Sequence, residues 1–163
     1  MERRRVYAEK HQIQKIDFAT DKKPFTGMVI CGVCGRAYGR KVWNSPDERL
    51  RRIIWRCNNK YVAKEEKGCG SRHVDDKVLY RAFIVAFNPV GEHRDYFMAK
   101  WVVQSEDVLK KVIVKRFIDT FGNAKPIKEF DVGLYFKLME KITVYEETLV
   151  VGLLDGSEVE CEI

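Results

Sequence analysis

The sequence predicts an α+β fold in which a small β-ribbon, a segment of short helices and a C-terminal antiparallel β-meander follow one another. Three observations lead to this prediction. Short strand-like runs occupy residues 26–72, apolar residues recur at helical spacing within residues 75–121, and three alternating segments close the chain from residue 142 onward. The Asp155–Gly156 pair between the last two segments is a strong hairpin signal.

Four regions are expected along the chain. They are residues 1–24 as the end of a preceding domain and a linker, 25–73 as the ribbon, 74–130 as the helical segment, and 131–163 as a short helix plus strands that complete the ribbon domain. The first 15 residues look like the end of a helix, but they begin abruptly with basic residues and lack a cap. We therefore expect the chain to be the C-terminal piece of a longer protein.

The ribbon is predicted from two runs of alternating β-branched and aromatic residues, at positions 37–44 and 51–57. Between them lies the turn-rich segment Ser-Pro-Asp-Glu, which is typical of a chain reversal. A hairpin is therefore expected, running away from Cys34 and returning at Cys57.

The helical segment is predicted from apolar residues at helical spacing. The expected helices cover residues 74–90, 91–104, 105–123 and 130–141, the last opened by Asp131. Asp75 or Asp76 is expected to cap the first helix and Pro89 to stop it, while Ser105 caps the third and Gly122 ends it. The aromatic residues at helical spacing are interpreted as core: Phe83, Phe87, Trp101, Phe117 and Phe121.

The composition suits a packed protein without a membrane span. Of the 163 residues, 45% are hydrophobic and 33% are charged, and no apolar run approaches the roughly 20 residues that a membrane-spanning helix needs. The N-terminus has no apolar stretch of the kind found in a secretory signal. We expect a soluble, cytoplasmic protein, in which disulfides are uncommon and clustered cysteines bind metal or perform redox chemistry.

Four of the five cysteines fall within 39 residues, with the spacing C-x2-C-x22-C-x11-C. Structural zinc sites use four thiolate or imidazole ligands arranged as a tetrahedron. We therefore predict one structural zinc ion held by Cys31, Cys34, Cys57 and Cys69. The eleven residues between the last two ligands form a polar, turn-prone loop. The first pair is expected to form a tight turn, in which Gly32 and Gly35 relieve crowding and permit positive φ.

Other interpretations of these cysteines remain open. A redox pair requires a Cys-x-x-Cys at the start of a helix, whereas strand-like runs stand on both sides of Cys31 and Cys34. The four could also be unrelated core cysteines. His73 could replace a cysteine as a ligand, but we expect it to be a surface or DNA-contacting residue. Cys161 alternates with polar neighbours and is expected to be a buried strand residue.

The positive charge is concentrated around the cysteines. Residues 36–73 contain eleven Lys or Arg and four Asp or Glu, a net of +7, whereas residues 74–163 contain twelve and sixteen, a net of −4. Basic blocks are often solvated surfaces, but this one coincides with the cysteine cluster. A binding surface for an anionic partner is therefore predicted there.

Residues 24–41, 53–60 and 68–79, together with residues 130–163, resemble the C-terminal zinc β-ribbon region of large serine site-specific recombinases. The GMVICGVCG opening with its basic strand and the EKITVY…DGSEVE ending carry the resemblance. It implies a parent integrase or resolvase of a phage or mobile element, with a catalytic serine domain that we do not expect in this chain. Many such enzymes insert a long coiled coil before the last strands, and residues 88–128 show no sustained heptads.

The resemblance implies that the ribbon binds double-stranded DNA, because a two-stranded ribbon fits the major groove and arginine pairs bidentately with guanine. We expect four arginines to form one cationic face of the ribbon: Arg36, Arg40, Arg52 and Arg56. The remaining basic residues are expected to contact phosphates: Lys41, Arg51, Lys60, Lys64, Lys67 and Arg72. Trp43 and Trp55 are expected to pack rather than to stack on bases.

A module for protein–protein interaction is the alternative function, because zinc ribbons can serve as rigid adaptors and the C-terminal half is acidic. Its partner would be another recombinase subunit or a regulatory factor. An RNA-binding ribbon also remains possible. The sequence shows no serine–histidine–acid set and no phosphate-binding loop, and four cysteines saturate a zinc ion. We therefore expect no autonomous enzyme, no small-molecule substrate and no membrane partner, and a DNA-associated location in a prokaryotic cytoplasm.

Overall fold

The computed structural model describes residues 19–43, 46–61, 67–104, 108 and 110–163. These residues form two β-sheets and four helices, so the predicted α+β class is confirmed. The expected helix before residue 15 lies outside the described residues. None of the described helices combines the length and apolar character required to cross a membrane.

The larger sheet has four strands in the order β1-β5-β6-β7. Its strands are β1 (Val29–Cys31), β5 (Met139–Val144), β6 (Thr148–Leu153) and β7 (Glu158–Glu162). The last three form the predicted antiparallel meander, and Gly156 takes a φ of 83° in the turn before β7. β1 joins this meander in parallel to β5, which places the start of the ribbon region against the C-terminal strands.

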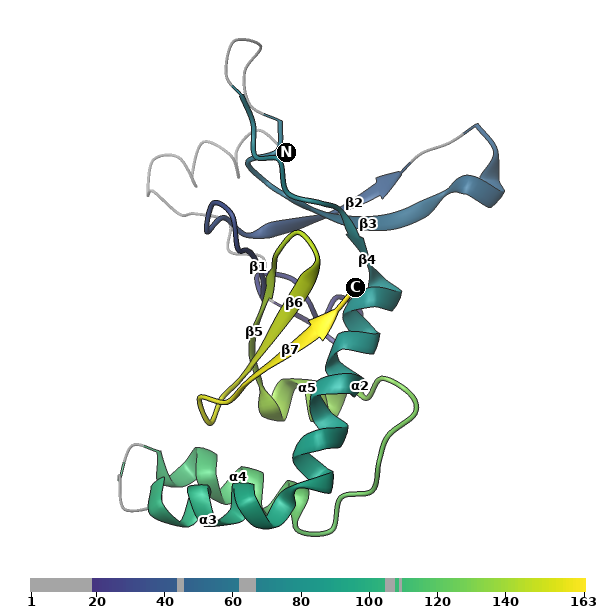
Figure 1. Cartoon of the computed structure of the whole chain (residues 1–163). Helices are drawn as coiled ribbons and strands as arrows, with labels where there is room; N and C mark the ends of the chain where they lie inside the picture. Colours follow the sequence, from purple (N-terminus) through teal and green to yellow (C-terminus); the bar gives the residue numbers. More distant parts are fainter. Residues whose placement is uncertain (1–18, 44–45, 62–66, 105–107, 109) are drawn as a thin grey trace, which may run out of the picture.

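The smaller sheet has three antiparallel strands in the order β2-β3-β4, and we call it the ribbon sheet. It consists of β2 (Tyr38–Trp43), β3 (Arg52–Cys57) and the two-residue β4 (Val74–Asp75). The predicted hairpin of two long strands is present, and a short 3-10 helix, η1 (Glu48–Leu50), lies between them. Figure 1 shows β2 and β3 reaching away from the rest of the molecule.

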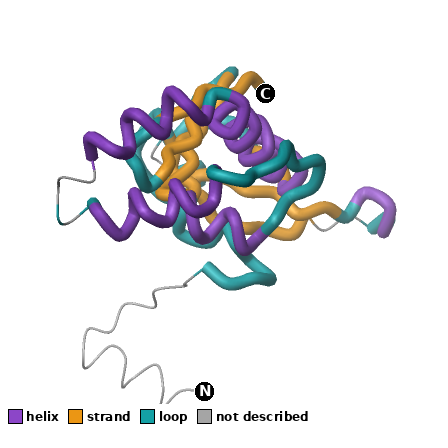
Figure 2. The backbone as a smooth tube through the Cα atoms, turned by 90° about the horizontal axis from the view of Figure 1, so that it is seen from below, coloured by secondary structure: helices purple, strands orange, loops and turns teal. Residues whose placement is uncertain are grey.

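The described helices are α2 (Asp76–Glu92), α3 (Arg94–Gln104), α4 (Lys111–Phe121) and α5 (Val132–Leu138). The predicted caps of two of them are confirmed, because Asp75 accepts from the N–H of Val78 at 3.0 Å and Asp131 accepts from that of Leu134 at 2.8 Å. α2 passes along the larger sheet, and α3 and α4 lie side by side at one end (Figures 1 and 2).

Three predicted helix boundaries are wrong. The helix expected over residues 130–141 ends at Leu138, because the chain from Met139 onward pairs with β6 as strand β5. Pro89 does not stop α2, which continues to Glu92. A proline in the last turn removes only one hydrogen bond, and the carbonyl of Pro89 still accepts from His93 at 2.9 Å. α4 begins at Lys111, later than expected, and the proposed cap Ser105 lies outside the described residues. Gly122 does end that helix, as predicted.

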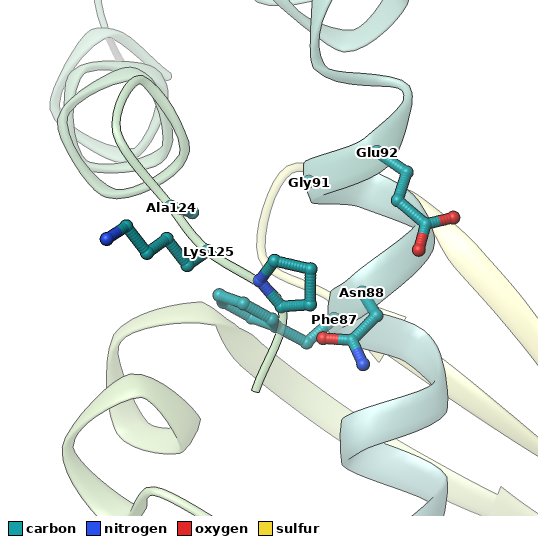
Figure 3. A pocket seen from close by; sticks show the side chains of 7 residues that line it. Phe87, Asn88, Gly91, Glu92, Ala124 and Lys125 are labelled. Atoms are coloured by element: carbon teal, nitrogen blue, oxygen red, sulfur yellow. The ribbon is translucent and has the colours of Figure 1, made fainter. Parts of the chain in front are cut away.

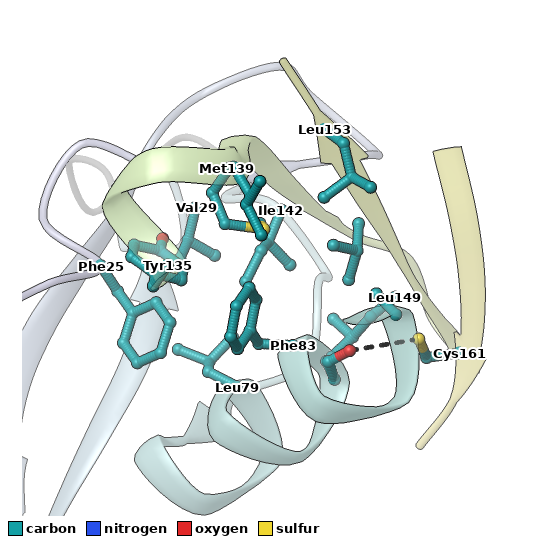
Figure 4. Close-up of a cluster of buried hydrophobic side chains, with 14 of the residues drawn as sticks. Phe25, Val29, Leu79, Phe83, Tyr135, Met139, Ile142, Leu149, Leu153 and Cys161 are labelled. Carbon is teal, nitrogen blue, oxygen red and sulfur yellow. Dashed lines mark hydrogen bonds between the residues drawn. The ribbon is translucent and has the colours of Figure 1, made fainter. Parts of the chain in front are cut away.

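The main core lies between α2 and the larger sheet (Figure 4). Phe83 is fully buried there, with ring centroids of Phe130 and Tyr135 both at 5.6 Å. Cys161 is buried in β7, as predicted, and its Sγ donates to the carbonyl of Ala82 on α2 at 3.6 Å. The five aromatic residues predicted to be core are all buried.

The helical pair α3–α4 is fastened to the larger sheet through a buried carboxylate. Asp155, in the turn between β6 and β7, accepts from Trp101 Nε1 at 2.8 Å and from the N–H and hydroxyl of Ser157 at 2.9 and 2.7 Å. Lys100 lies 3.6 Å from the same carboxylate. Because this buried charge is both paired and hydrogen-bonded, it fixes α3 to the turn.

Trp55 joins the ribbon sheet to the main core. Its indole Nε1 donates to Asp76 at the start of α2 at 2.6 Å, and its ring meets that of Phe25 edge-on at 6.1 Å. A second contact runs from Arg72 Nη1 to the carbonyl of Glu146 at 3.1 Å. The ribbon sheet is therefore attached along one face and leaves the other face available.

Candidate metal centre and nucleic-acid interface

The first half of the cysteine cluster is a tight turn at the end of β1. The carbonyl of Cys31 accepts from the N–H of Gly35 at 2.8 Å, and Gly35 takes the predicted positive φ, at 70°. Gly32 is required for a different reason, because a Cβ at this position would lie 2.5 Å from the ring of Tyr145. The turn thus brings the side chain of Cys34 back toward that of Cys31.

The second half is assembled where β3 ends. Asn59 donates from its N–H to Cys57 Sγ at 3.4 Å, and its carbonyl accepts from the N–H of Cys69 at 2.8 Å. A Cβ on Gly68 would collide with the carbonyl oxygen of Lys60, so this close approach of two chain segments needs glycine. Backbone bonds therefore hold Cys69 beside Cys57 although eleven residues separate them in the sequence.

The four sulfur atoms lie within 4.8 Å of one another. Cys31 Sγ is 3.7 Å from Cys69 Sγ, and Cys34 Sγ is 3.3 Å from Cys57 Sγ. Zinc–sulfur bonds of about 2.3 Å in a tetrahedron place the sulfurs about 3.8 Å apart, so the donor set fits a zinc ion closely. The cluster is a site for one structural zinc.

The environment of the cluster differs from one cysteine to the next. Cys31 and Cys57 are buried, whereas Cys34 is exposed. Burial raises the pKa of the Cys57 thiol to about 12. Zinc binds the thiolate, so metal binding at this position must release a proton that the apoprotein would keep at neutral pH.

The register of β2 and β3 corrects the predicted cationic face. Residues directly opposite each other in an antiparallel pair point to the same face. Arg40 is opposite Trp55, whereas Lys41, Trp43, Arg52 and Arg56 share the other face with Ile54. The prediction that Arg40 joins Arg52 and Arg56 on one face is therefore wrong. We call the face with Lys41, Trp43, Arg52 and Arg56 the outer face, because Trp55 on the opposite face packs toward α2.

Aromatic rings accompany both arginines of the outer face. The guanidinium of Arg52 lies 5.7 Å from the ring centroid of Trp43, and that of Arg56 lies 4.5 Å from the ring centroid of Tyr61. Trp55 is buried, as expected, but Trp43 is 48% exposed, so the packing prediction is wrong for Trp43. The sequence shows that tryptophans and arginines occur together in this region. It does not show which of the two tryptophans is buried and which is exposed beside an arginine.

His73 lies at the edge of the same face, with its ring centroid 6.4 Å from that of Trp43. Its Nε2 is buried and has no hydrogen-bond partner among the residues that the structure describes. Burial lowers the pKa of His73, and the positive charges of Lys60, Arg56 and Arg52 lower it further. The imidazole is therefore neutral at pH 7, and the charged groups near it are the cations of Lys60, Arg56 and Arg52.

The other predicted DNA-contacting residues are spread around the ribbon sheet. Arg36, Arg51 and Lys67 are exposed, and Arg51 Nη1 lies 3.5 Å from Glu48 Oε1. Lys60 donates to the carbonyl of Ser71 at 2.5 Å, and Arg72 to that of Glu146. Lys64 lies outside the described residues.

A pocket of about 100 Å³ opens between α2 and the segment after α4 (Figure 3). The side chain of Asn88, beside this pocket, makes two hydrogen bonds with the backbone of Ile127. Asn88 Nδ2 donates to the carbonyl of Ile127 at 3.1 Å, and Asn88 Oδ1 accepts from the N–H of Ile127 at 2.9 Å. Asn88 therefore fastens the loop after α4 to α2.

Comparisons with known proteins give a family match and similar folds. Residues 24–88 match the recombinase zinc beta ribbon domain. A crystal structure of an LSR–DNA complex is similar with a TM-score of 0.54 and 12% identity, covering 93% of this chain and 62% of that chain. A structure concerning the sequence requirements of the Listeria innocua prophage attP site has a TM-score of 0.38 and 16% identity, covering 78% of this chain and 41% of that chain. No match was found among curated proteins.

Proposed function

Because the resemblance to the zinc-ribbon region of large serine recombinases is confirmed, with residues 24–88 matching the recombinase zinc beta ribbon domain, we propose that this chain is a DNA-binding module of such an enzyme. It binds part of a recombination site as double-stranded DNA. The recombinase zinc ribbon is a non-catalytic module, so the chain contributes binding and positioning rather than strand cleavage. The chain spans 62% of the LSR chain that it resembles, and that chain was crystallised with DNA.

The outer face of the ribbon sheet is the observation that carries the proposal. It presents Lys41, Arg52 and Arg56 on a hairpin that reaches away from the rest of the molecule (Figure 1). The B-DNA major groove is about 12 Å wide and admits a two-stranded β-ribbon. The net charge of +7 within residues 36–73 suits a polyanion, whose condensed counterions are released on binding.

The zinc site supports the proposal because it anchors one end of the hairpin. The two strands of the hairpin meet the metal site at one end, because Cys57 ends β3 opposite Tyr38 of β2. Tyr38 in turn donates from its hydroxyl to the carbonyl of Arg72 at 2.8 Å. A hairpin anchored in this way loses little conformational freedom on binding, and pre-organisation of this kind favours affinity.

The proposal is tested by titrating the whole chain with duplex DNA at several salt concentrations. Wild type should bind with an affinity that falls steeply as salt rises. Lys60→Gln and Lys67→Gln should each weaken binding to all duplexes and lower the salt slope by about one unit if the lysine contacts a phosphate. Arg94→Ala, on α3 far from the ribbon sheet, is the matched control and should change neither quantity. Salt-independent binding, or none, would contradict the proposal.

A module for protein–protein interaction is the second candidate, favoured by the acidic surface of the larger sheet. Glu158, Glu160 and Glu162 alternate along the edge strand β7 and are all exposed. Such a strand repels DNA and suits a basic protein surface, for example that of another recombinase subunit. If wild type fails to bind DNA while Glu160→Lys disrupts a complex with the parent recombinase, this candidate replaces the first.

A further inference from the structure

Two exposed aromatic side chains on the ribbon are unexplained by packing. Trp43 is 48% exposed at the end of β2, and Tyr61 is 64% exposed just beyond the end of β3. Their rings nevertheless have a consistent position, since each one lies against the guanidinium of an outer-face arginine. Large aromatics and arginines are the side chains that dominate the energetic centres of binding surfaces.

The backbone fixes both arginine–aromatic pairs. Trp43 and Arg52 are directly opposite each other in the register of β2 and β3. Tyr61 follows the turn in which the N–H of Lys60 donates to the carbonyl of Cys57 at 3.1 Å, and this turn brings the ring back over Arg56. The second pair is therefore positioned by the same turn that presents the metal ligand Cys57.

Within the part of the chain that the structure describes, no carboxylate lies within ion-pair distance of the guanidinium group of Arg52 or Arg56. In contrast, Arg49 in η1 lies 2.9 Å from Asp47. A guanidinium that lies over a ring, without an acid beside it, keeps N–H donors available, and those donors match the O6 and N7 acceptors of guanine.

The spacing of the pairs sets a distance on the DNA. Arg52 and Arg56 are four residues apart on β3 and point to the same face. At about 3.3 Å per residue, their Cα atoms are about 13 Å apart along the strand. Base pairs rise by about 3.4 Å along the DNA axis, so the two arginines would reach base pairs about four steps apart where β3 runs parallel to that axis.

We propose that Trp43 and Tyr61 are positioning residues that hold Arg52 and Arg56 as two preformed readers of guanine, about four base pairs apart in the major groove. This inference rests on the proposed DNA-binding function. The aromatic rings restrict the rotamers of the arginines before DNA arrives, so less side-chain entropy is lost on binding. Arg40, on the opposite face of the sheet, takes no part in this reading.

The experiment is a selection of duplexes from a randomised pool by the whole zinc-loaded chain. Wild type should enrich guanine at two positions about four base pairs apart. Arg52→Ala should remove the preference at one position and Arg56→Ala at the other, each with about 5- to 150-fold weaker binding to the selected duplex. Trp43→Leu should relax the same position as Arg52→Ala, and Tyr61→Leu the same position as Arg56→Ala, with about 2- to 5-fold weaker binding.

Further variants separate a positioning role from a structural one. Trp43→Leu and Tyr61→Leu remove no charge, so the salt slope should stay at the wild-type value. Tyr61→Phe keeps the ring and should restore the guanine preference. Tyr96→Leu, which removes an aromatic ring that is 71% exposed on α3, is the matched control and should have no effect. Zinc content should equal that of wild type in every variant.

Each result decides between the two proposals. If wild type binds DNA but selects no sequence, or if Trp43→Leu and Tyr61→Leu leave both preferences intact, the inference is overturned and the DNA-binding function stands. If wild type binds no duplex at all, the proposed function itself fails. Enrichment of two guanines, with each aromatic variant relaxing the position of its own arginine, supports the inference.

Discussion

The ribbon sheet and the α2-packed sheet are stabilised in different ways. Only Tyr38, Ile54, Trp55, Cys57 and Val74 are buried in the ribbon sheet. All but Ile54 belong to the same continuous cluster of side chains that fills the space between α2 and the larger sheet. Segments shorter than about 40 residues rarely bury enough surface to fold alone. The ribbon therefore depends on its metal site, and the rest of the molecule depends on its core.

The charge distribution follows the same division. Residues 36–73 have a net charge of +7 and residues 74–163 a net charge of −4. Like charges on a small sheet repel one another and oppose folding. Because zinc supplies folding free energy directly, the ribbon tolerates a cationic surface that a hydrophobic core of its size would not stabilise. The metal thus allows the outer face to be cationic.

The largest effect is expected when the metal site is broken. Cys57→Ser should reduce zinc from about one ion per chain to background and unfold the ribbon sheet, because three ligands do not close a structural site. The core around Phe83 should remain folded. Metal analysis and amide hydrogen exchange measure the two outcomes. Cys161→Ala, which changes a buried cysteine outside the cluster, should keep full zinc content. Joint unfolding of both regions by Cys57→Ser would refute their independence.

The next effect concerns the core. Phe83→Ala should lower the free energy of unfolding by about 3–5 kcal/mol, since a fully buried ring among aromatic neighbours is replaced by a cavity. Zinc content under native conditions should not change. Urea unfolding of the zinc-loaded chain measures the loss. A loss of zinc in this variant would mean that the metal site needs the core.

A smaller effect is expected at the junction of the two regions. Trp55→Phe keeps a ring against Phe25 but removes the donor to Asp76, and should cost about 1.5–3 kcal/mol. Trp43→Phe is the matched control on the exposed side of the same hairpin and should change stability by less than about 0.5 kcal/mol. Equal costs in the two variants would show that the junction contributes nothing specific.

The smallest effect is a pH dependence of DNA binding. The pKa of His73 is lowered in the free protein by burial and by Lys60, Arg56 and Arg52. Phosphates that neutralise these cations would raise it, so the complex takes up a proton and binding strengthens as pH falls from 7.5 to 6. His73→Gln should remove this few-fold dependence. Affinities measured at constant zinc content test it, and an unchanged slope in the variant would assign the dependence elsewhere.

Local chemistry explains what the sequence predicted well. Cys31 and Cys34 lie in one turn, and the caps Asp75 and Asp131 bond to an N–H only three residues away. The hairpin at Gly156 is likewise decided by neighbouring residues. Such features depend on a few backbone angles and on short-range hydrogen bonds, which the residue types specify directly.

The sequence by itself thus determined the metal ligands, the order of helices and strands and the basic character of the ribbon. Tertiary structure decided which face each arginine takes, because pairing Tyr38 with Cys57 sets a register, and a shift by one residue would exchange the faces. It also decided that Trp55 is buried while Trp43 is exposed. Both tryptophans stand in similar alternating runs, and only contact with Phe25 and Asp76, far from Trp55 in the sequence, distinguishes them.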